Sequence, residues 1–385
     1  MLSLDGDGSA VVYLSLLPAA ERGRKGDFIM KSFLRAGLAL PVLYLFSVCA
    51  LILPSSAGAN PACGDTLTSG VTTMDAALVC TDTGDGTAAL TLTGSATLDM
   101  NGFYIVCGDH ADDLTAVLMD GVFLNGTKNT LANGAIRNCQ DGVELGGGGG
   151  HTVSMVHATE GWDDGFDVKS DGNKLSQVTS WGNDDAGVVL VGNKNQVTNS
   201  VARSNDIDGF DIEGDGNKLK FVTSYGNLDD GFWIDGNKNS LSNISAADNG
   251  DEGIDISNTA DGNKIKSAHT VSSGDNGIEL EGNKNKLSGV VILGPPDDGV
   301  DLWGTATGNK LSKVFVAEPS GEGIELDTAG NSVQKSTSVM SPSTDAYDEA
   351  SDIAGSCVNS WKGNHFANGW PAECVGSVLN TPPLP

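Results

Sequence analysis

The stretch Asp163-Asp164-Gly165-Phe166-Asp167-Val168 returns along the chain with small changes. It reads Ile-Asp-Gly-Phe-Asp-Ile at 207–212, Asp-Glu-Gly-Ile-Asp-Ile at 251–256 and Asp-Asp-Gly-Val-Asp-Leu at 297–302. After each glycine, two apolar residues flank one variable residue, which is the period-2 pattern of a strand with its apolar side chains inward. The step recurs every 22 to 24 residues, at Gly142, Gly165, Gly187, Gly209, Gly231, Gly253, Gly277, Gly299 and Gly323.

A second signature, the triplet Gly-Asn-Lys, recurs between these strands. Glycine and asparagine tolerate positive φ, so the triplets predict corners between sheets. Leu or Ile follows every second triplet directly, while an Asn and one more residue intervene in the others, which indicates a two-coil unit of 44 to 46 residues. The triplets begin at Gly172, Gly192, Gly216, Gly236, Gly262, Gly282 and Gly308.

Repeats of this length predict an all-β fold, a right-handed parallel β-helix in which each strand pairs only with the coils above and below. We expect about 10–12 coils with capped ends, because a solenoid must cover its terminal strand edges. The β-helix domain is expected to span 60–376, followed by a C-terminal tail at 377–385.

The N-terminal region is not expected to be part of the mature protein, which should start near Asn60. Residues 30–59 read as a signal peptide, with basic Lys31 and Arg35, an apolar run and the small residues of 57–59 as a cleavage site. Residues 1–29 precede Met30 and are interpreted as a mis-called upstream extension. The sequence therefore predicts a secreted protein, extracellular, periplasmic or on the cell surface, with no membrane span after cleavage. A transmembrane anchor is the alternative interpretation of 30–59.

Net charge limits the classes of partner, and the cysteine content predicts disulfides. The formal net charge is −28, which argues against nucleic acid as a partner. We expect a monomer. The cysteines outside the predicted signal form an even set, which favours disulfides in an exported chain. Cys357 with Cys374 is the favoured pair, and the pairing of the others stays open: Cys63, Cys80, Cys107 and Cys139.

Two acidic columns should run along the solenoid, because stacking places equivalent residues about 4.8 Å apart. Carboxylates at that spacing repel by roughly 1 kcal/mol in water, so something must offset the repulsion. Solvent, salt, nearby lysines and bonds from each Asp to its own turn are one answer, and calcium is the other. The outward strand position gives Glu144, Asp167, Val189, Asp211, Trp233, Asp255, Glu279, Asp301 and Glu325. The position before the glycine gives Asp141, Asp164, Ala186, Asp208, Asp230, Glu252, Asn276, Asp298 and Glu322.

The cluster 163–167, together with Val-Thr-Ser-Trp-Gly-Asn at 178–183, resembles the β-helical pectate lyases of polysaccharide lyase family 9. The stretch 297–303 resembles them as well. The repeated frame over about 62–376 is similar to exported β-helix repeat proteins of the pectate-lyase-like superfamily, in which the Asp-Gly-x-Asp step is often structural.

The resemblance to family 9 implies a catalytic calcium held by the motif aspartates and by one aspartate of the coil before. Carried over, the ligands are Asp163, Asp164, Asp167 and Asp141. A lysine acts as base in that family, and this chain offers Lys194 and Arg203 in the following coils.

Two aromatic residues, Trp181 and Tyr225, occupy matching places two coils apart and suggest a sugar-stacking platform, although half-buried loop aromatics would look the same. The hypothesis is a calcium-dependent lyase that cleaves a uronate-containing polysaccharide by β-elimination, with calcium bridging the acidic polymer to the protein. The alternative is a non-catalytic surface or structural protein that binds calcium or carbohydrate. The repeat is interrupted at 186–189, Trp233 and 295–296, and a cleft with a basic residue beside 185–233 would favour the enzyme over the binding protein.

Overall fold

The computed structural model describes residues 2–4, 10–12, 60–80, 88–108 and 119–376. The solenoid lies in a compact unit that spans Ser55–Pro385, and Met1–Pro54 forms a separate unit. In the latter, β1 (Leu2–Leu4) pairs with β2 (Ala10–Val12) in antiparallel fashion. The predicted signal peptide and the tail at 377–385 lie outside the described residues. No helix among the described residues is long and apolar enough to span a membrane.

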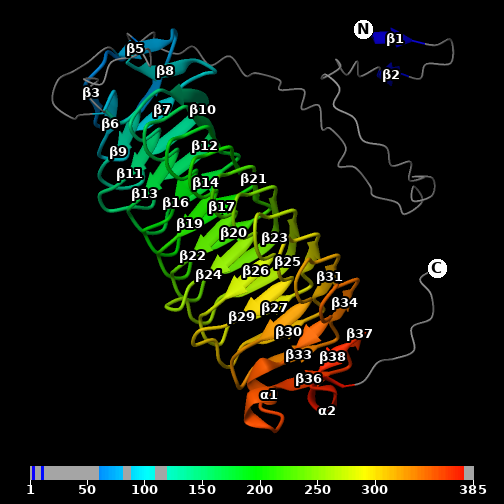
Figure 1. Cartoon of the computed structure of the whole chain (residues 1–385). Coiled ribbons are helices and arrows are strands. Elements are labelled where there is room, and N and C mark those ends of the chain that lie inside the picture. The colour runs from blue at the N-terminus through cyan, green and yellow to red at the C-terminus, as the bar shows by residue number, and fades with distance from the viewer. Residues whose placement is uncertain (1, 5–9, 13–59, 81–87, 109–118, 377–385) are drawn as a thin grey trace. The chain divides into compact units, whose positions relative to one another are not determined.

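The solenoid is a parallel β-helix, as predicted, with short strands stacked coil on coil (Figure 1). Its first sheet contains 14 strands, so the solenoid is longer than the 10–12 coils expected, because the opening and closing segments also contribute strands. These strands are β3 (Asp65–Leu67), β6 (Leu90–Leu92), β9 (Val122–Leu124), β11 (Val143–Leu145), β13 (Phe166–Val168), β16 (Val188–Val189), β19 (Phe210–Ile212), β22 (Phe232–Ile234), β24 (Ile254–Ile256), β26 (Ile278–Leu280), β29 (Val300–Leu302), β32 (Ile324–Leu326), β35 (Ala346–Tyr347) and β38 (Gly369–Trp370).

The second and third sheets follow in each coil. Four long strands run around the corner between them: β10 (Thr130–Arg137), β12 (Thr152–Thr159), β23 (Ser240–Ala247) and β25 (Lys264–Val271). The second sheet also contains β4 (Val71–Thr73), β7 (Thr97–Asp99), β14 (Lys174–Ser176), β17 (Gln196–Thr198), β20 (Lys218–Lys220), β27 (Lys286–Ser288), β30 (Lys310–Ser312), β33 (Ser332–Gln334) and β36 (Ser360–Lys362). The third also contains β5 (Leu78–Cys80), β8 (Tyr104–Cys107), β15 (Thr179–Trp181), β18 (Val201–Arg203), β21 (Thr223–Tyr225), β28 (Val291–Leu293), β31 (Phe315–Ala317), β34 (Thr337–Val339) and β37 (His365–Phe366).

The repeated Gly-apolar-x-apolar step builds the first sheet. Its apolar residues are fully buried and stack in columns, and the rings of Phe210 and Phe232 lie parallel with centroids 5.1 Å apart. The glycine is required by close approach, since a Cβ at Gly165 would lie 2.2 Å from Ser180 Oγ and 2.7 Å from the carbonyl oxygen of Gly187. The variable middle residue is therefore left facing outward.

A buried asparagine ladder forms the corner between the first and second sheets. In each coil, the Asn Oδ1 accepts the backbone N–H of the equivalent residue in the coil before, as Asn217 does from Asn195 at 2.7 Å. The ladder explains why the Gly-Asn-Lys triplets alternate. The left-handed residue before the ladder asparagine is the Gly of one triplet, Gly172, and the Lys of the next, Lys194. The ladder asparagine is therefore the middle residue of the first triplet, Asn173, but follows the second, as Asn195. Its members are Asn173, Asn195, Asn217, Asn239, Asn263, Asn285, Asn309, Asn331 and Asn359.

Disulfides hold the two ends. The predicted pair Cys357–Cys374 is confirmed, and it connects the segment after α1 (Glu349–Ala354) to α2 (Ala372–Val375). The two pairs that the sequence left open are Cys63–Cys80 and Cys107–Cys139, both near the N-terminal end of the solenoid. The coils between Cys139 and Cys357 contain no cysteine and are held by stacking.

The asparagine ladder predicts a position-dependent cost. Asn217→Ala removes the acceptor of the Asn195 N–H and the donor to the Gly214 carbonyl, both buried, so we expect a loss of about 2–3 kcal/mol of unfolding free energy. Asn193→Ala is the matched control. It also removes two hydrogen bonds, to Asp215 and Asp171, but water replaces them at this exposed corner. Equal shifts of the urea midpoint for the two variants would contradict a buried-ladder role.

Candidate functional site

The outward column predicted from the repeat is present on the first sheet. Strand register places Glu144 beside Asp167, Asp211 beside Trp233 and Glu279 beside Asp301. The second column also stacks, but its side chains bond the next coil and not their own turn. Asp141 Oδ1 accepts the Asp164 N–H at 3.2 Å, and Asp208 Oδ1 accepts the Asp230 N–H at 2.9 Å. We call these two columns the acidic face.

Three aspartates at the start of the acidic face converge. Carboxylate oxygens of Asp141, Asp163 and Asp164 all lie within 4.8 Å of one another, at the corner that leads into β11 and β13. Burial, and then the charges of Asp120, Asp167 and Asp163, raise the pKa of Asp141 to about 8. Burial, and then the charges of Asp141 and Asp185, raise the pKa of Asp164 to about 9. The cluster therefore favours any partner that supplies positive charge.

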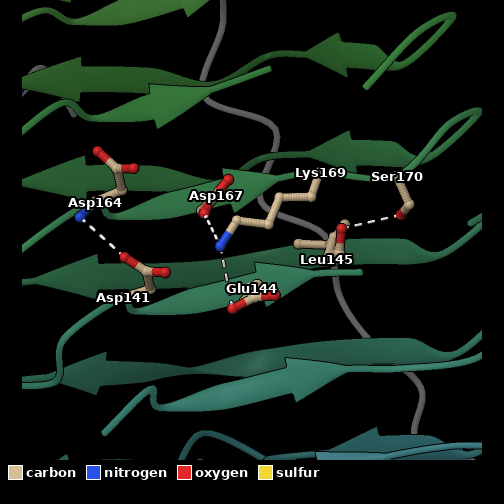
Figure 2. A network of polar contacts seen from close by, with 7 residues as sticks. All are labelled: Asp141, Glu144, Leu145, Asp164, Asp167, Lys169 and Ser170. Carbon is tan, nitrogen blue, oxygen red and sulfur yellow. Dashed lines mark hydrogen bonds and ion pairs between the residues drawn. The ribbon is translucent and has the colours of Figure 1, made fainter. Parts of the chain in front are cut away.

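Asp167 lies beside this group and is paired differently. Its Oδ2 lies 2.5 Å from Lys169 Nζ, which also lies 3.3 Å from Glu144 Oε2 (Figure 2). Its Oδ1 is buried and accepts no hydrogen bond from the described residues. Burial raises the pKa of Asp167, although Lys169 opposes the shift. Burial alone would lower the pKa of Lys169, but the hydrogen bond and charge of Asp167 outweigh it and raise that pKa.

Sequence reasoning missed Lys169 and Asp120. Lys169 follows Asp167 by two residues, and the period-2 rule for strands places both side chains on one face. Asp120 belongs to the step Asp120-Gly121-Val122, one coil before the first glycine of the alignment, and its carboxylate joins those of Asp141 and Glu144. Burial and then the charge of Glu144 raise the pKa of Asp120 to about 6.

The other lysines do not offset the acidic face, contrary to one of the two expectations. Among the described residues, the ion pairs involve Lys169 alone. The remaining lysines of residues 60–376 lie on the outer face of the second sheet or at its two corners. The repulsion within the acidic face must therefore be relieved by protons, salt or a bound cation.

The two predicted base residues lie apart from the cluster. Lys194 lies at the corner after the first sheet, whereas Asp163 and Asp164 lie at the corner before it. Its surroundings are a hollow of about 350 Å³ lined by Asp171, Asn193, Lys194, Asp215, Gly216 and Lys238. Arg203 lies on the third sheet.

The predicted aromatic platform contains Arg203 between its two rings. Strand register aligns Trp181, Arg203 and Tyr225 on successive coils. The guanidinium carbon lies 4.6 Å from the Trp181 ring centroid and 5.9 Å from that of Tyr225. Both rings are more than one-third exposed. This arrangement places a positive charge between two flat, partly exposed rings.

The donor set of the cluster fits a hard divalent cation. Calcium takes six to eight oxygen ligands, commonly from Asp and Glu, and the cluster offers three closely spaced carboxylates, with the carboxylate of Asp167 close enough for its charge to act on Asp141 and Asp164. The acidic face repeats the arrangement further along: a buried oxygen of Asp211, Asp255 and Asp301 is also unbonded. Further groups are Asp251–Glu252–Asp275 and Asp298–Asp301–Glu325.

The raised pKa values predict that the protein without calcium loses stability as pH rises. Asp211 is a test site outside these groups, because burial and the charges of Glu213 and Asp208 raise its pKa from 3.8 to about 8. The folded state therefore binds a proton that the unfolded state has released. We expect Asp211→Asn to melt above the wild type in chelator, with an advantage that grows from about pH 4 to about pH 8 and then levels off. A pH-independent difference would contradict a buried charge at this position.

Comparison with known proteins places the fold. The family described as right-handed β-helix region matches residues 86–225 and 165–316. The structure of pre-mature bacteriophage phi29 gene product 12 is similar with a TM-score of 0.57 at 12% identity, covering 82% of this chain and 54% of that one. The Azotobacter vinelandii mannuronan C-5 epimerase AlgE6 A-module has a TM-score of 0.45 at 16% sequence identity, over 73% of this chain and 85% of that one. Pectate lyase Pel9A has a TM-score of 0.36 at 13% identity, over 76% of this chain and 73% of that one. No curated protein sequence matches. Because the family match extends over more than half of the residues of this chain, the chain belongs to the right-handed β-helix family.

Proposed function

We propose that this protein is a secreted, calcium-dependent lyase that cleaves a uronate-containing polysaccharide by β-elimination. The observation that carries the proposal is the convergence of Asp141, Asp163 and Asp164, with Asp167 near enough for its charge to act on Asp141. These four residues are the proposed calcium ligands. Bound calcium would supply a positive charge that holds the substrate carboxylate and stabilises the charge that develops when the C5 proton leaves.

Lys169 is the basic residue that we assign to proton transfer, in place of Lys194 or Arg203. Its Nζ already contacts Asp167 and Glu144, so it lies on the acidic face next to the cluster. The charges of these carboxylates keep Lys169 protonated. A cation bound beside it would neutralise those charges and add a positive charge of its own; both effects, together with burial, lower the pKa of Lys169, so that it can release its proton and then accept the substrate's. Catalysis would therefore require calcium twice, for substrate binding and for a competent base.

Arg203 and its two aromatic neighbours are assigned to substrate binding. The Trp181 and Tyr225 rings offer stacking surfaces for sugar rings, and the guanidinium between them can bind a carboxylate in bidentate fashion. β15 and β18 lead into the turns with Asp185 and Ile207, which are the equivalents of Asp163 in the next two coils. The platform therefore borders the corner between the third and first sheets, where the cluster lies.

A second candidate function is a non-catalytic calcium-binding solenoid. The observation that favours it is the recurrence of carboxylate groups at Asp251–Glu252–Asp275 and Asp298–Asp301–Glu325, far along the chain from Lys169. Such a protein would bind several calcium ions along the acidic face with similar affinity and release no product.

The two functions differ in how calcium and the cluster affect activity. We expect ultraviolet-absorbing unsaturated products from polygalacturonate or alginate with calcium and none with chelator. Asp163→Asn with Asp164→Asn should abolish product and reduce the rise in melting temperature on adding calcium. The matched control is Asp184→Asn with Asp206→Asn, which removes the same charge from exposed positions outside the cluster. No product on any polyuronate, with several calcium ions bound, would support the second function instead.

Lys169→Met separates the base from the metal site. We expect it to lower the rate of product formation by about 100-fold or more, the usual loss when a general base is removed. Calcium should still raise its melting temperature, because the carboxylates remain. A variant with near-normal rate would exclude Lys169 as the base.

A further inference from the structure

The second sheet presents an outer face whose charge is opposite to that of the acidic face. From β10 to β36, no outward-facing residue of this sheet is acidic; all are Lys, Ser, Thr, Gln or Ala. We call the outward residues of β14 to β30 the lysine face. They are Lys174, Ser176, Gln196, Thr198, Lys218, Lys220, Ser240, Ser242, Lys264, Lys266, Lys286, Ser288, Lys310 and Ser312.

The lysines of this face carry unrelieved positive charge. Lys264, Lys286 and Lys310 lie next to one another on three successive coils, and each is exposed. Like charges at the spacing of adjacent strands repel, and within the described residues no ion pair involves them. Three aligned cations in a chain of net charge −28 offer a local site for an anionic partner with charges spaced along its length.

The acidic face does not cancel this positive charge at physiological ionic strength. The two faces belong to different sheets, and packed sheets lie about 10 Å apart. Exposed charges separated by more than a Debye length, about 8 Å at physiological salt, are largely screened from each other. A polyanion near the lysine face is therefore little affected by the acidic face.

A single exposed phenylalanine borders the lysine face. Phe221 lies at the corner between the second and third sheets with φ of 56°, and half of its surface is exposed. The equivalent residues of the neighbouring coils are Asn199 and Asn243, which suit this left-handed conformation, whereas a bulky side chain there is unfavourable. Lys220 Nζ lies 4.7 Å from the ring centroid. An exposed ring held in a costly conformation beside a lysine suggests contact with a ligand.

A hollow borders the opposite edge of the lysine face. It is the 350 Å³ hollow between Lys194 and Lys238, two coils apart, with Gly216 in the coil between. The Lys-Gly alternation continues to Gly262 and Lys284, so it follows the two-coil unit of the sequence. Asp171 and Asp215 in the same hollow are engaged with the next coil's Asn. Ammonium, amide and carboxylate groups together suit a ligand with both acidic and hydroxyl groups.

We propose that the lysine face binds an anionic polysaccharide chain without calcium, with Phe221 as a stacking contact. The substrate class is taken from the proposed function, but the surface is separate from the calcium cluster. Lysine ammonium groups meet the sugar carboxylates, and the Ser and Thr hydroxyls between them meet the sugar hydroxyls. The surface would keep the protein on its polymer while the acidic face engages another segment.

Two other occupants are less suited to these observations. Nucleic acid is a polyanion, but the disulfides indicate an oxidising compartment, and neither arginine of the solenoid, Arg137 or Arg203, lies on this face. The acidic face of a second copy would match the lysines along the entire solenoid and join copies into open arrays. A single Phe221 in one coil fits a local ligand contact better than such a uniform one.

Binding of the full chain to polygalacturonate in chelator and physiological salt tests the proposal. Neutralising Lys264, Lys286 and Lys310 to Gln should weaken binding by about tenfold or more, since each lysine near an anionic surface contributes about 1 kcal/mol. The control is Val291→Glu with Ala317→Glu and Thr337→Glu, which changes net charge equally on third-sheet strands away from the aromatic platform and should bind as the wild type does. Asp163→Asn with Asp164→Asn should also bind normally, so loss of lyase activity does not decide the result.

Phe221→Asn gives a second, independent readout. Because Asn is the residue of the neighbouring coils, this variant should melt at or above the wild-type temperature, and its affinity for polygalacturonate should fall several-fold. Unchanged affinity in the triple lysine variant would overturn the proposal. Tighter binding of double-stranded DNA than of polygalacturonate, or a self-association in sedimentation that the triple lysine variant abolishes, would overturn it in favour of the other occupants.

Discussion

Stacking of identical positions at the strand spacing is the constraint on which this molecule depends. Each side chain meets the equivalent residue of the coil before and the coil after, so a residue type is tolerated only if it can pack or bond with itself. Apolar residues satisfy this by packing, as the parallel rings of Phe210 and Phe232 do. Asparagine satisfies it because it both donates and accepts, and it fills the buried corner from Asn173 to Asn359. Like charges that stack repel one another, so the charged columns of this fold indicate where a partner of opposite charge would be favoured.

The two kinds of charge are separated by sheet, which follows from the same constraint. A mixed column of acids and lysines would bond internally and leave nothing for a ligand, whereas each pure column depends on something outside the chain. The acidic face has buried, unbonded carboxylate oxygens at Asp167, Asp211, Asp255 and Asp301. The lysines of the lysine face are exposed, and none of the outward residues of its strands is acidic. Cations with oxygen ligands suit the first surface, and an extended hydrated polyanion suits the second.

The spacing of the repeat predicted the stacking of residues correctly. Similarity between short motifs, without regard to their place in the coil, did not predict where a side chain lies. The 22-residue step gave the strands, the inward and outward residues, the acidic columns and the convergence of Asp141, Asp163 and Asp164, because a parallel solenoid fixes which residues stack. The Gly-Asn-Lys triplets look equivalent but are not. Lys174 and Lys194 each end a triplet, yet Lys174 lies in a strand and Lys194 at a left-handed corner. Lys169 needed no long-range information, only the period-2 rule applied one residue beyond the repeat. The stacking of Arg203 between Trp181 and Tyr225 depends on rotamers that spacing does not determine.

The interruptions of the repeat decide where a specific site can lie on a face that otherwise repeats. Among the coils of the acidic face, the one with Asp163, Asp164 and Asp167 is followed directly by Ala186 and Val189, which supply no carboxylate at either column position. It is also the coil in which a lysine joins the acidic face. A cation held by this coil would therefore meet Asp141 of the coil before, but on the side of the next coil the two column positions are apolar and Asp185 is the nearby carboxylate. The coils around Asp255 and Asp301 lack this asymmetry, since further acids stack beyond them. A break after a cluster, more than the cluster itself, distinguishes a binding site from the rest of the acidic face.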